Sequence, residues 1–548
     1  MPTIEIIKKD LEKLLGKKLA LEELAEKAMP FAKAEVETAE GDKLKISIKD
    51  TNRPDLLSVE GIARELRGFY GIELGLPRFK VRKSDVKVSV DPKLKNIRPK
   101  GAYAIAKGIK VTEHLLEQMI QLQEKICETF GRKRKEIAIG LFDYDKVNGN
   151  LHYYAADTDT KFVPLDFNEK LSLKEILKVH PKGMEYGHLL EGHSKYPLLV
   201  DSEQEVLSMP PIINSEYSGK VTPKTTNIFI DVTGFNQELI NIALDIVCAA
   251  LHDRGASIKS VTVEYKGEKI ITPILGSHKI EVPLALIENI FGEKVNADSM
   301  KKFAEMKRMN CKIKQQSIEA EYPSYRADIL HAVDIVEDLL IAADYNKLRP
   351  EHVHIATKGS ELEERLLVNV AREACIGLGL QEVLTFTLSS KERQQKNMLL
   401  PEMEFVELEN PISSEYCIFR RSLLPELLAV LSKNKHRAYP QHIFEAGKIV
   451  LLKKSPDGKA YVDEKQVLAI ALADQKANFN EIKAYFDALC NAMGWHYKME
   501  RAEHVSFEKG LCASIKLDEK RGIIGEISKK VLENFGLSMP VAVLEIEL

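Results

Sequence analysis

Hydrophobic and polar positions repeat with two different periods along the N-terminal part of the chain. Apolar side chains recur at helical spacing in the Leu-rich stretch 11–28, whereas residues 45–48 alternate as a strand does. The string NRPD at 52–55 has the composition of a turn, and residues 57–66 then repeat with helical spacing. These elements predict a small N-terminal module over residues 1–90.

The middle of the chain mixes both periods. Residues 113–130 predict an amphipathic helix, and the short apolar runs 137–144 and 226–234 predict buried strands. A charged stretch at 80–100 separates these elements from the N-terminal module and is typical of a linker. We therefore expect a mixed α/β domain over residues 95–265.

Two further regions follow. Residues 270–350 combine a strand with helices expected near 283–291 and 297–309 and with a third, acidic helix, which predicts a small helix-rich module. From about residue 355 a long helical pattern opens a last domain, 355–548. Its strand-like segments are 382–388, 405–411, 442–452, 466–473 and 521–527. Clustered strands favour an antiparallel sheet, so the whole chain is predicted to be a multidomain α+β protein.

Composition changes this picture little. The 548 residues are 44% hydrophobic and 29% charged, as in ordinary globular proteins of several domains. The net charge of −3 supplies no overall field that would attract nucleic acid, so any contact with RNA must use local patches. The run 132–135, RKRK, is such a patch, and it fits either a solvated corner or a site for phosphates.

Cysteine usage and the lack of long apolar runs bear on where the protein works. The seven cysteines are scattered and never spaced as C-x-x-C, which argues against a disulfide framework and a zinc site. No apolar run reaches the roughly 18 residues that span a membrane, and the N-terminus lacks the apolar core of a signal peptide. We expect a cytoplasmic protein without a membrane partner.

The acidic helix and the residues just before it carry the most distinctive chemistry. Asp334, Glu337 and Asp338 lie at i, i+3 and i+4 and share one helical face, while Asp328 lies just upstream. No Lys or Arg follows Arg326 before this helix ends. Oxygen ligands alone suit Mg²⁺ or Ca²⁺. The open alternative is that one acid caps the helix and the others pair with bases from distant segments.

The same segment resembles a known family. The strings PSYRADI and DIVED are similar to the magnesium-binding domain of phenylalanyl–tRNA synthetase beta subunits. The string TNRPDLLSVEGIAR at 51–64 is similar to the N-terminal module of that family. The resemblance implies a Mg²⁺ cofactor. Its ligands would be Asp328, Asp334, Glu337 and Asp338, the last of which stands where many relatives carry Glu.

The last domain resembles class II aminoacyl-tRNA synthetases without their full catalytic set. The strings ENP at 409–411, FRR at 419–421 and FEAG at 444–447 resemble the second motif of that class. An active member also carries a Gly-rich motif ending in Arg near its C-terminus, which this sequence lacks. We therefore predict a class II synthetase-like domain without activity, in which Arg420 and Arg421 have structural or interface roles.

The resemblance also implies partners. In this family the inactive domain pairs with a catalytic alpha subunit, which supplies the ATP and phenylalanine chemistry for charging tRNA(Phe). The expected assembly is an alpha2beta2 heterotetramer. The chain ends soon after the class II-like domain, as in archaeal and eukaryotic members, whereas bacterial relatives carry a further RNA-binding domain.

A polar cluster in the α/β domain is the remaining candidate for an activity. The string MPPIIN at 209–214 predicts a rigid turn, and hydrogen-bonding side chains surround it. The cluster contains Ser208, Asn214, Ser215, Glu216, Asp231 and Thr233. It has no His or Cys of a nucleophilic triad, and such residues also cap turns and strand ends, so a purely structural role is open.

The resemblance identifies this region with an editing domain that hydrolyses tyrosine wrongly esterified to tRNA(Phe). Editing is needed because an apolar pocket rejects an isostere with one added hydroxyl by only about 10²-fold. The polar cluster would line the editing pocket with Leu199 as a wall. Asp231 would orient the water or the amine at the tRNA terminus, and Glu216 would accept the tyrosine hydroxyl. The alternative is a non-catalytic scaffold that docks tRNA and keeps a vestigial pocket.

Overall fold

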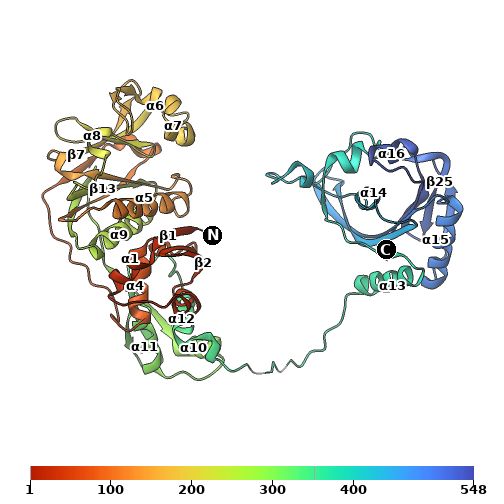
Figure 1. Cartoon of the computed structure of the whole chain (residues 1–548), viewed down its shortest axis with the longest axis horizontal. Helices are drawn as coiled ribbons and strands as arrows, with labels where there is room; N and C mark the ends of the chain where they lie inside the picture. The colour runs from red at the N-terminus through yellow and green to blue at the C-terminus, as the bar shows by residue number, and fades with distance from the viewer. Residues whose placement is uncertain (1, 351, 354) are drawn as a thin grey trace. The chain divides into compact units, whose positions relative to one another are not determined.

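The computed structural model of the chain describes all residues except 1, 351 and 354. It divides into two compact units, Met1–Glu351 and His352–Leu548 (Figure 1). Helices and strands occur in both units, which confirms the predicted multidomain α+β class. No helix in the described part of the chain is long and apolar enough to cross a membrane.

The N-terminal module is a small antiparallel sheet with helices packed beside it. Its strands, in spatial order, are β1 (Thr3–Ile7), β3 (Lys43–Ile48) and β2 (Ala34–Glu40). The predicted helix 11–28 is interrupted, because α1 (Lys8–Leu15) ends at Gly16 in the left-handed conformation that glycine adopts easily. The helix expected at 57–66 is confirmed as α4 (Val59–Phe69), which packs against α1.

A ten-stranded sheet forms the middle of the first unit. Its strands, in spatial order, are β12 (Ile213–Asn214), β11 (Val206–Met209), β10 (Lys195–Val200), β7 (Leu151–Asp157), β4 (Lys87–Val90), β14 (Ser257–Tyr265), β5 (Lys100–Lys107), β13 (Asn227–Gly234) and β6 (Ile137–Asp143), with β15 (Glu268–Thr272) paired to β14. The helices of this region are α5 (Glu113–Glu128), α6 (Leu173–Val179), α7 (Pro181–Tyr186), α8 (Glu216–Gly219) and α9 (Gln237–Asp253). The two longest, α5 and α9, pack against the β5–β13–β6 end of the sheet.

Alternation along β13 decides which of its side chains can take part in chemistry. Ile228, Ile230 and Val232 are buried in the apolar core to which α5 and α9 also contribute. Successive side chains of a strand point to opposite faces of the sheet. Asp231 and Thr233 therefore point away from that core.

The domain boundary predicted near residue 90 lies inside this sheet. The stretch 80–100, which the sequence predicts as a linker, contributes β4, and β4 pairs in parallel with both β7 and β14. At the other end, β15 extends the sheet to Thr272, beyond the predicted limit of 265. β4 has four residues, too few for alternation to stand out in a charged stretch.

The acidic module is built from a three-stranded sheet and three helices. Its elements are β16 (Ser277–Pro283), β18 (Ser317–Pro323) and β17 (Asn310–Ile313) in that spatial order, and α10 (Leu284–Phe291), α11 (Ala297–Met306) and α12 (Ala332–Ala343). α11 ends three residues before the predicted limit at 309. Lys307 and Arg308, which follow it, are buried. Two positive charges therefore enter the interior here.

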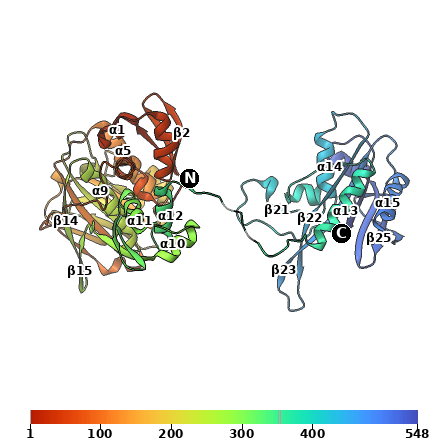
Figure 2. The same cartoon turned by 90° about the horizontal axis from the view of Figure 1, so that it is seen from below.

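The second unit contains a seven-stranded sheet, of which β22, β23 and β25 are labelled in Figure 2. Its strands, in spatial order, are β19 (Gln381–Glu382), β22 (Gln441–Lys454), β23 (Ala460–Ala473), β27 (Val541–Glu547), β26 (Lys520–Ile527), β25 (Phe507–Leu517) and β24 (Lys498–Arg501). Its longer helices are α13 (Glu363–Gly377), α14 (Leu424–Lys433) and α15 (Phe479–Met493). Pairing is antiparallel except between β19 and β22.

Both faces of this sheet are covered. Ala469 and Ala471 of β23 pack in the core with α14, while Leu468 and Ile470 pack in the core with α13 and α15. The strands predicted at 442–452, 466–473 and 521–527 are confirmed as β22, β23 and β26. The strands predicted at 382–388 and 405–411 are mostly wrong, since only β19, β20 (Leu388–Ser389) and a single bridge at Glu407 occur there.

Candidate functional site

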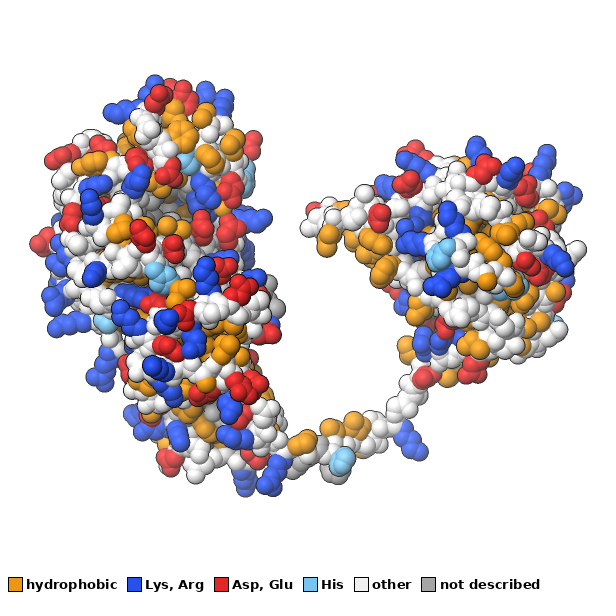
Figure 3. Space-filling view, viewed as in Figure 1, with side chains coloured by type: hydrophobic (Ala, Val, Ile, Leu, Met, Phe, Trp, Pro, Cys, Tyr) orange, Lys and Arg blue, Asp and Glu red, His pale blue; other side chains and the backbone are white. Residues whose placement is uncertain are grey.

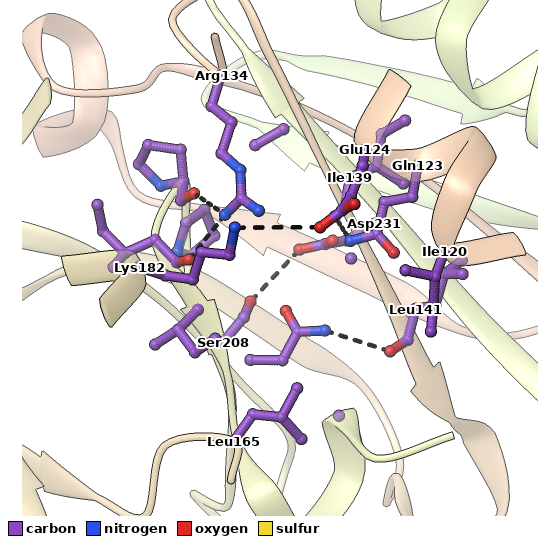
Figure 4. A pocket seen from close by; sticks show the side chains of 18 of the residues that line it. Ile120, Gln123, Glu124, Arg134, Ile139, Leu141, Leu165, Lys182, Ser208 and Asp231 are labelled. Carbon is purple, nitrogen blue, oxygen red and sulfur yellow. Dashed lines mark hydrogen bonds and ion pairs between the residues drawn. The ribbon is translucent and has the colours of Figure 1, made fainter. Parts of the chain in front are cut away.

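A cavity of about 410 Å³ opens where the β13 and β6 edge of the large sheet meets β11, β12 and helix α5. Its lining includes four of the polar residues predicted from sequence: Ser208, Asn214, Asp231 and Thr233. Leu116, Ile120, Leu141, Leu165 and Ile213 supply apolar walls. Figure 4 shows Ser208 and Asp231 directed toward one another across the cavity.

Asp231 is the central ionisable group of the cavity and only 3% exposed. The hydroxyl of Ser208 donates to its Oδ2 at 3.4 Å, and the backbone amide of Gly140 donates to its carboxylate. Burial raises the pKa of Asp231 to about 7, against the opposing effects of Gly140, Ser208 and the charge of Arg98. The carboxyl group therefore exchanges its proton near neutral pH.

Gly140 makes room for that carboxylate. It lies directly opposite Asp231 in the pairing of β6 with β13. A Cβ atom at position 140 would stand 2.1 Å from Asp231 Oδ1 and 2.7 Å from the ring of Phe142. Only glycine therefore leaves the carboxylate where it is.

Asn214 and Thr233 are held by backbone and side-chain hydrogen bonds. Asn214 pairs with Ser208 across β12 and β11, and its Nδ2 donates to the Leu141 carbonyl at 3.3 Å. Thr233 accepts two bonds from Arg98, one at its Oγ1 (2.9 Å) and one at its carbonyl oxygen (2.6 Å). Both side chains thus have fixed orientations at the cavity wall.

Three residues predicted for the pocket do not line the cavity. Ser215 caps α8 through its hydroxyl, which lies 3.0 Å from that of Ser218. Glu216 accepts from Lys220 at 2.5 Å, which lowers its pKa, and it also binds the Asp166 amide. Leu199 is fully buried in the apolar core with Tyr103 and Phe229. These three predictions are corrected because each side chain has another local role. Ser215 caps a helix, Glu216 binds a backbone amide at Asp166, and Leu199 packs in an apolar core.

Sequence reasoning missed several charged residues of the cavity. Arg134 comes from the basic run 132–135, and its Nη1 donates to the carbonyls of Pro211 (3.1 Å) and Ile212 (2.8 Å). Lys182 and Glu124 face each other at 4.0 Å in the same lining (Figure 4). The basic run was the available signal, but its positive charge alone does not say which side chain turns inward.

The arrangement suits binding and hydrolysis of an ester. A volume of this size is in the range of small-molecule pockets. A carboxylate that titrates near neutrality can take a proton from water, and hydroxyl and amide donors can stabilise an oxyanion. Arg134 and Lys182 place positive charge where an anionic group could bind. The lining contains Ser208 and His180, but they are not bonded to one another: Ser208 donates to Asp231, and the His180 ring contacts the Leu165 carbonyl and the Lys182 amide. Without an activated serine or cysteine, a bound water is the natural nucleophile.

The acidic module is organised differently. Arg326 donates to both oxygens of Asp328 (2.7 and 2.6 Å) and to Asp338 Oδ2 (2.6 Å), all inside the protein. Lys307 lies 3.6 Å from Asp338 and 2.6 Å from Glu65, and Lys33 lies 3.7 Å from Asp338. Lys33 comes from the N-terminal module, Lys307 directly follows α11, and Arg326 lies between β18 and α12.

The four acids predicted to bind magnesium are therefore occupied separately. Asp328 and Asp338 pair with Arg326, Asp334 accepts from the amides of His331 and Leu330 at the start of α12, and Glu337 pairs with Lys33 at 2.9 Å. Among the described residues no group of three or more such side chains could hold a metal ion. The set does not fit one shared ion in this structure, and the magnesium site stays a prediction.

The guanidinium of Arg420, in the second unit, is likewise engaged in hydrogen bonds within the protein. It is buried and donates to Glu445 Oε1 and Thr385 Oγ1, both at 2.7 Å, and to the Lys448 carbonyl. Arg421 donates to the Glu404 carbonyl at 2.8 Å. Both arrangements agree with the structural role predicted for these arginines.

Comparison with known proteins covers the entire chain. Family models match the B3/4 domain at residues 116–246, the tRNA synthetase B5 domain at 280–345 and the phenylalanyl tRNA synthetase beta chain CLM domain at 351–548. The phenylalanine–tRNA ligase beta subunits of Pyrococcus horikoshii and Archaeoglobus fulgidus are 45% and 37% identical, over 100% of this chain and 99% and 98% of theirs.

A solved structure is similar to the first unit. It is an N-terminal fragment of the phenylalanyl-tRNA synthetase beta subunit from Pyrococcus horikoshii. The two share 48% identity with a TM-score of 0.61, over 63% of this chain and 100% of the fragment.

Proposed function

The chain belongs to the family of phenylalanine–tRNA ligase beta subunits, and we propose that it adds hydrolytic proofreading to tRNA charging. The target is tyrosine esterified to tRNA(Phe), the error that an apolar phenylalanine pocket rejects least well. The alternative, a scaffold with a vestigial pocket, is less favoured because the cavity keeps a polarised carboxyl, oriented donors and open volume together.

The observation that carries this proposal is the buried Asp231 at the wall of a cavity of about 410 Å³. Ionised Asp231 accepts a proton from water while the water oxygen bonds to the ester carbonyl carbon. The bond to the ribose oxygen then breaks, and the ribose oxygen takes up the proton. The products are tyrosine and tRNA. The second N–H of Asn214 Nδ2, which the Leu141 carbonyl leaves free, supplies a donor for the oxyanion, and such a donor is worth about 10²–10³ in rate in comparable sites.

The second unit serves assembly in this proposal. It is a class II-like domain whose Arg420 is committed to Glu445, so ATP and phenylalanine chemistry belongs to an alpha subunit in an alpha2beta2 ligase. Leu384 and Phe386 are 82% and 71% exposed, and Ile412 is fully exposed. Hydrophobic side chains at the surface of this unit are visible in Figure 3. Exposed apolar residues of this kind favour a protein partner.

The test is deacylation of Tyr-tRNA(Phe) by the purified full-length chain in cytoplasm-like buffer. We expect hydrolysis well above the buffer rate and much slower hydrolysis of Phe-tRNA(Phe). Equal, buffer-like rates for both would favour the scaffold. ATP–pyrophosphate exchange by the chain without alpha subunit should be absent, because the guanidinium of Arg420 is engaged by Glu445 and Thr385 and does not bind phosphate.

A further inference from the structure

Arg98 is a buried arginine that contacts Thr233, a residue of the cavity wall, without lining the cavity itself. It lies between the short 3-10 helix η3 (Pro92–Asn96) and β5, and only 2% of it is exposed. Its Nε and Nη2 hold the Oγ1 and the carbonyl of Thr233 at 2.9 and 2.6 Å. The guanidinium therefore fixes both the side chain and the backbone of a cavity residue.

The same guanidinium also holds the turn that carries Arg134. Its Nη1 donates to the carbonyls of Arg134 and Lys135, each at 3.2 Å. This turn is unusual, because Arg132, Lys133 and Arg134 have φ angles of 49°, 52° and 62° in succession. Residues other than glycine rarely adopt this left-handed backbone conformation, and consecutive residues hold it where the surrounding structure imposes it.

A salt bridge does not explain this burial. Within the described residues no carboxylate lies within ion-pair distance of Arg98, and its guanidinium donates to neutral oxygens of Thr233, Arg134 and Lys135. Burial lowers the pKa of Arg98, as expected for a cation without a counter-ion. The planar guanidinium of arginine has five N–H donors and can therefore bond two separate backbone segments at once.

We propose that Arg98 is a positioning residue for the editing cavity. It fixes Thr233 and the left-handed turn 132–134 as one rigid wall, so that Arg134 reaches the carbonyls of Pro211 and Ile212 beside Asp231. The inference rests on the proposed hydrolysis and extends it to a residue that never touches the substrate. Without Arg98 the turn relaxes, Arg134 leaves the wall and the substrate ester is misplaced.

The test compares three variants of the full-length chain in deacylation of Tyr-tRNA(Phe). Arg98→Met should lower kcat by about 10²-fold, the size expected when reacting groups move by about 1 Å. Arg98→Lys keeps the charge but not the fork, and should recover only part of that loss. Arg308→Met is the matched control, because Arg308 is a buried arginine of the same unit that binds the Glu73 carbonyl. It should lower the melting temperature without changing kcat.

A second measurement separates positioning from general weakening. In a background that already carries Arg134→Gln and Thr233→Val, Arg98→Met should slow kcat little further, because residues acting as one unit are not additive. The inference would be overturned if Arg98→Met lowered kcat in that background by as large a factor as in the parent chain. It would also be overturned if Arg308→Met lowered kcat as much as Arg98→Met does, or if Arg98→Lys kept full activity. If Arg98→Met hydrolyses Tyr-tRNA(Phe) as fast as the parent chain, the inference is overturned but the proposed function still holds. A parent chain without hydrolysis would overturn the proposed function, and this inference with it.

Discussion

Asp231 and Asp338 are two aspartates of the first unit with nearly the same burial, 3% and 0% exposed, and opposite electrostatics. Around Asp231 the direct hydrogen-bond donors are neutral, the Ser208 hydroxyl and the Gly140 amide, and burial raises its pKa to about 7. Burial also acts on Asp338, but the charges of Arg326, Lys307 and Lys33 hold its pKa far below the usual range.

The difference shows that burial alone does not decide what a carboxylate does. Four bases gather around Asp338 and Asp328, and they come from segments far apart in the chain, so the ion pairs tie the N-terminal module to the acidic module. In the part of the chain that the structure describes, Asp231 has no ion pair of that kind, and burial raises its pKa to about 7. The ion pairs of Asp338 join two modules, whereas a buried carboxyl with a raised pKa, such as Asp231, has the property expected of a proton acceptor in a functional site.

Breaking the ion cluster should give the largest change. Asp338→Asn leaves Arg326 and Lys307 buried without their full counter-charge, which typically costs about 3–5 kcal/mol in the free energy of unfolding. Urea denaturation of the full-length chain measures this, and hydrolysis of Tyr-tRNA(Phe) below the transition should stay at the parent rate. A loss under about 1 kcal/mol would show that the cluster does not hold the modules together.

Asp231→Asn should show the reverse pattern. We expect a loss of about 10²–10³ in deacylation rate, since a proton acceptor and orienting group is removed. Stability at pH 8 should not fall, because a neutral amide replaces a carboxylate that burial disfavours. Asp245→Asn is the matched control: Asp245 is also buried, with its pKa raised to about 6, but it binds Ser324 away from the cavity. Equal deacylation defects in both variants would contradict a specific role.

The two aspartates should also respond to pH in opposite directions. Asp231 must lose its proton to act as a base, so deacylation above the buffer rate should rise about tenfold per pH unit below 7 and level off above it. Because its folded-state pKa is raised, Asp231 lowers the free energy of unfolding as pH rises from about 4 to 7. Asp338, whose pKa is lowered, contributes stability above about pH 4 that is lost as pH falls. A pH-independent rate in parent and Asp231→Asn would contradict this assignment.

The smallest effect should come from the outer acids of the acidic module. Glu337 is half-exposed and pairs with Lys33, so Glu337→Gln should cost at most about 1 kcal/mol. The ion pairs of the structure favour an equal loss in magnesium and in chelator, measured as the melting temperature. A shared magnesium ion would instead make the loss larger in magnesium, because an ion that binds only the folded state adds stability.

Sequence patterns predicted those elements in which periodicity was strong. α5, β13 and β23 lie where the pattern put them, because one face of each is buried or the run is apolar throughout. α9 escaped prediction, since most of its residues are buried and no polar stripe marks the helical period. The segment 382–388, expected as a strand, exposes Leu384 and Phe386, so apolar character there did not mean burial.

The candidate site divides in the same way. Ser208, Asn214, Asp231 and Thr233 were assigned to a pocket through the family resemblance, because turn and strand chemistry alone left a purely structural role open; all four line the cavity. Arg98 and Arg134 could not be predicted, because their roles depend on tertiary contacts with Thr233 and Pro211 that no local pattern contains. The sequence left open that the acids pair with bases from distant segments, but it could not name Lys33 and Lys307, which are remote from Asp338 in the chain.

The glycine opposite Asp231 has a consequence for inheritance. Any single-base missense change in a glycine codon introduces a side chain, and at position 140 its first carbon would overlap the Asp231 carboxylate and the Phe142 ring. Under the proposed editing function, the gene thus carries a codon at which nearly every replacement would affect the removal of mischarged tRNA rather than the supply of charged tRNA. The same proposal implies that cells with such an allele would still charge tRNA(Phe) and would show a defect only when tyrosine is abundant relative to phenylalanine.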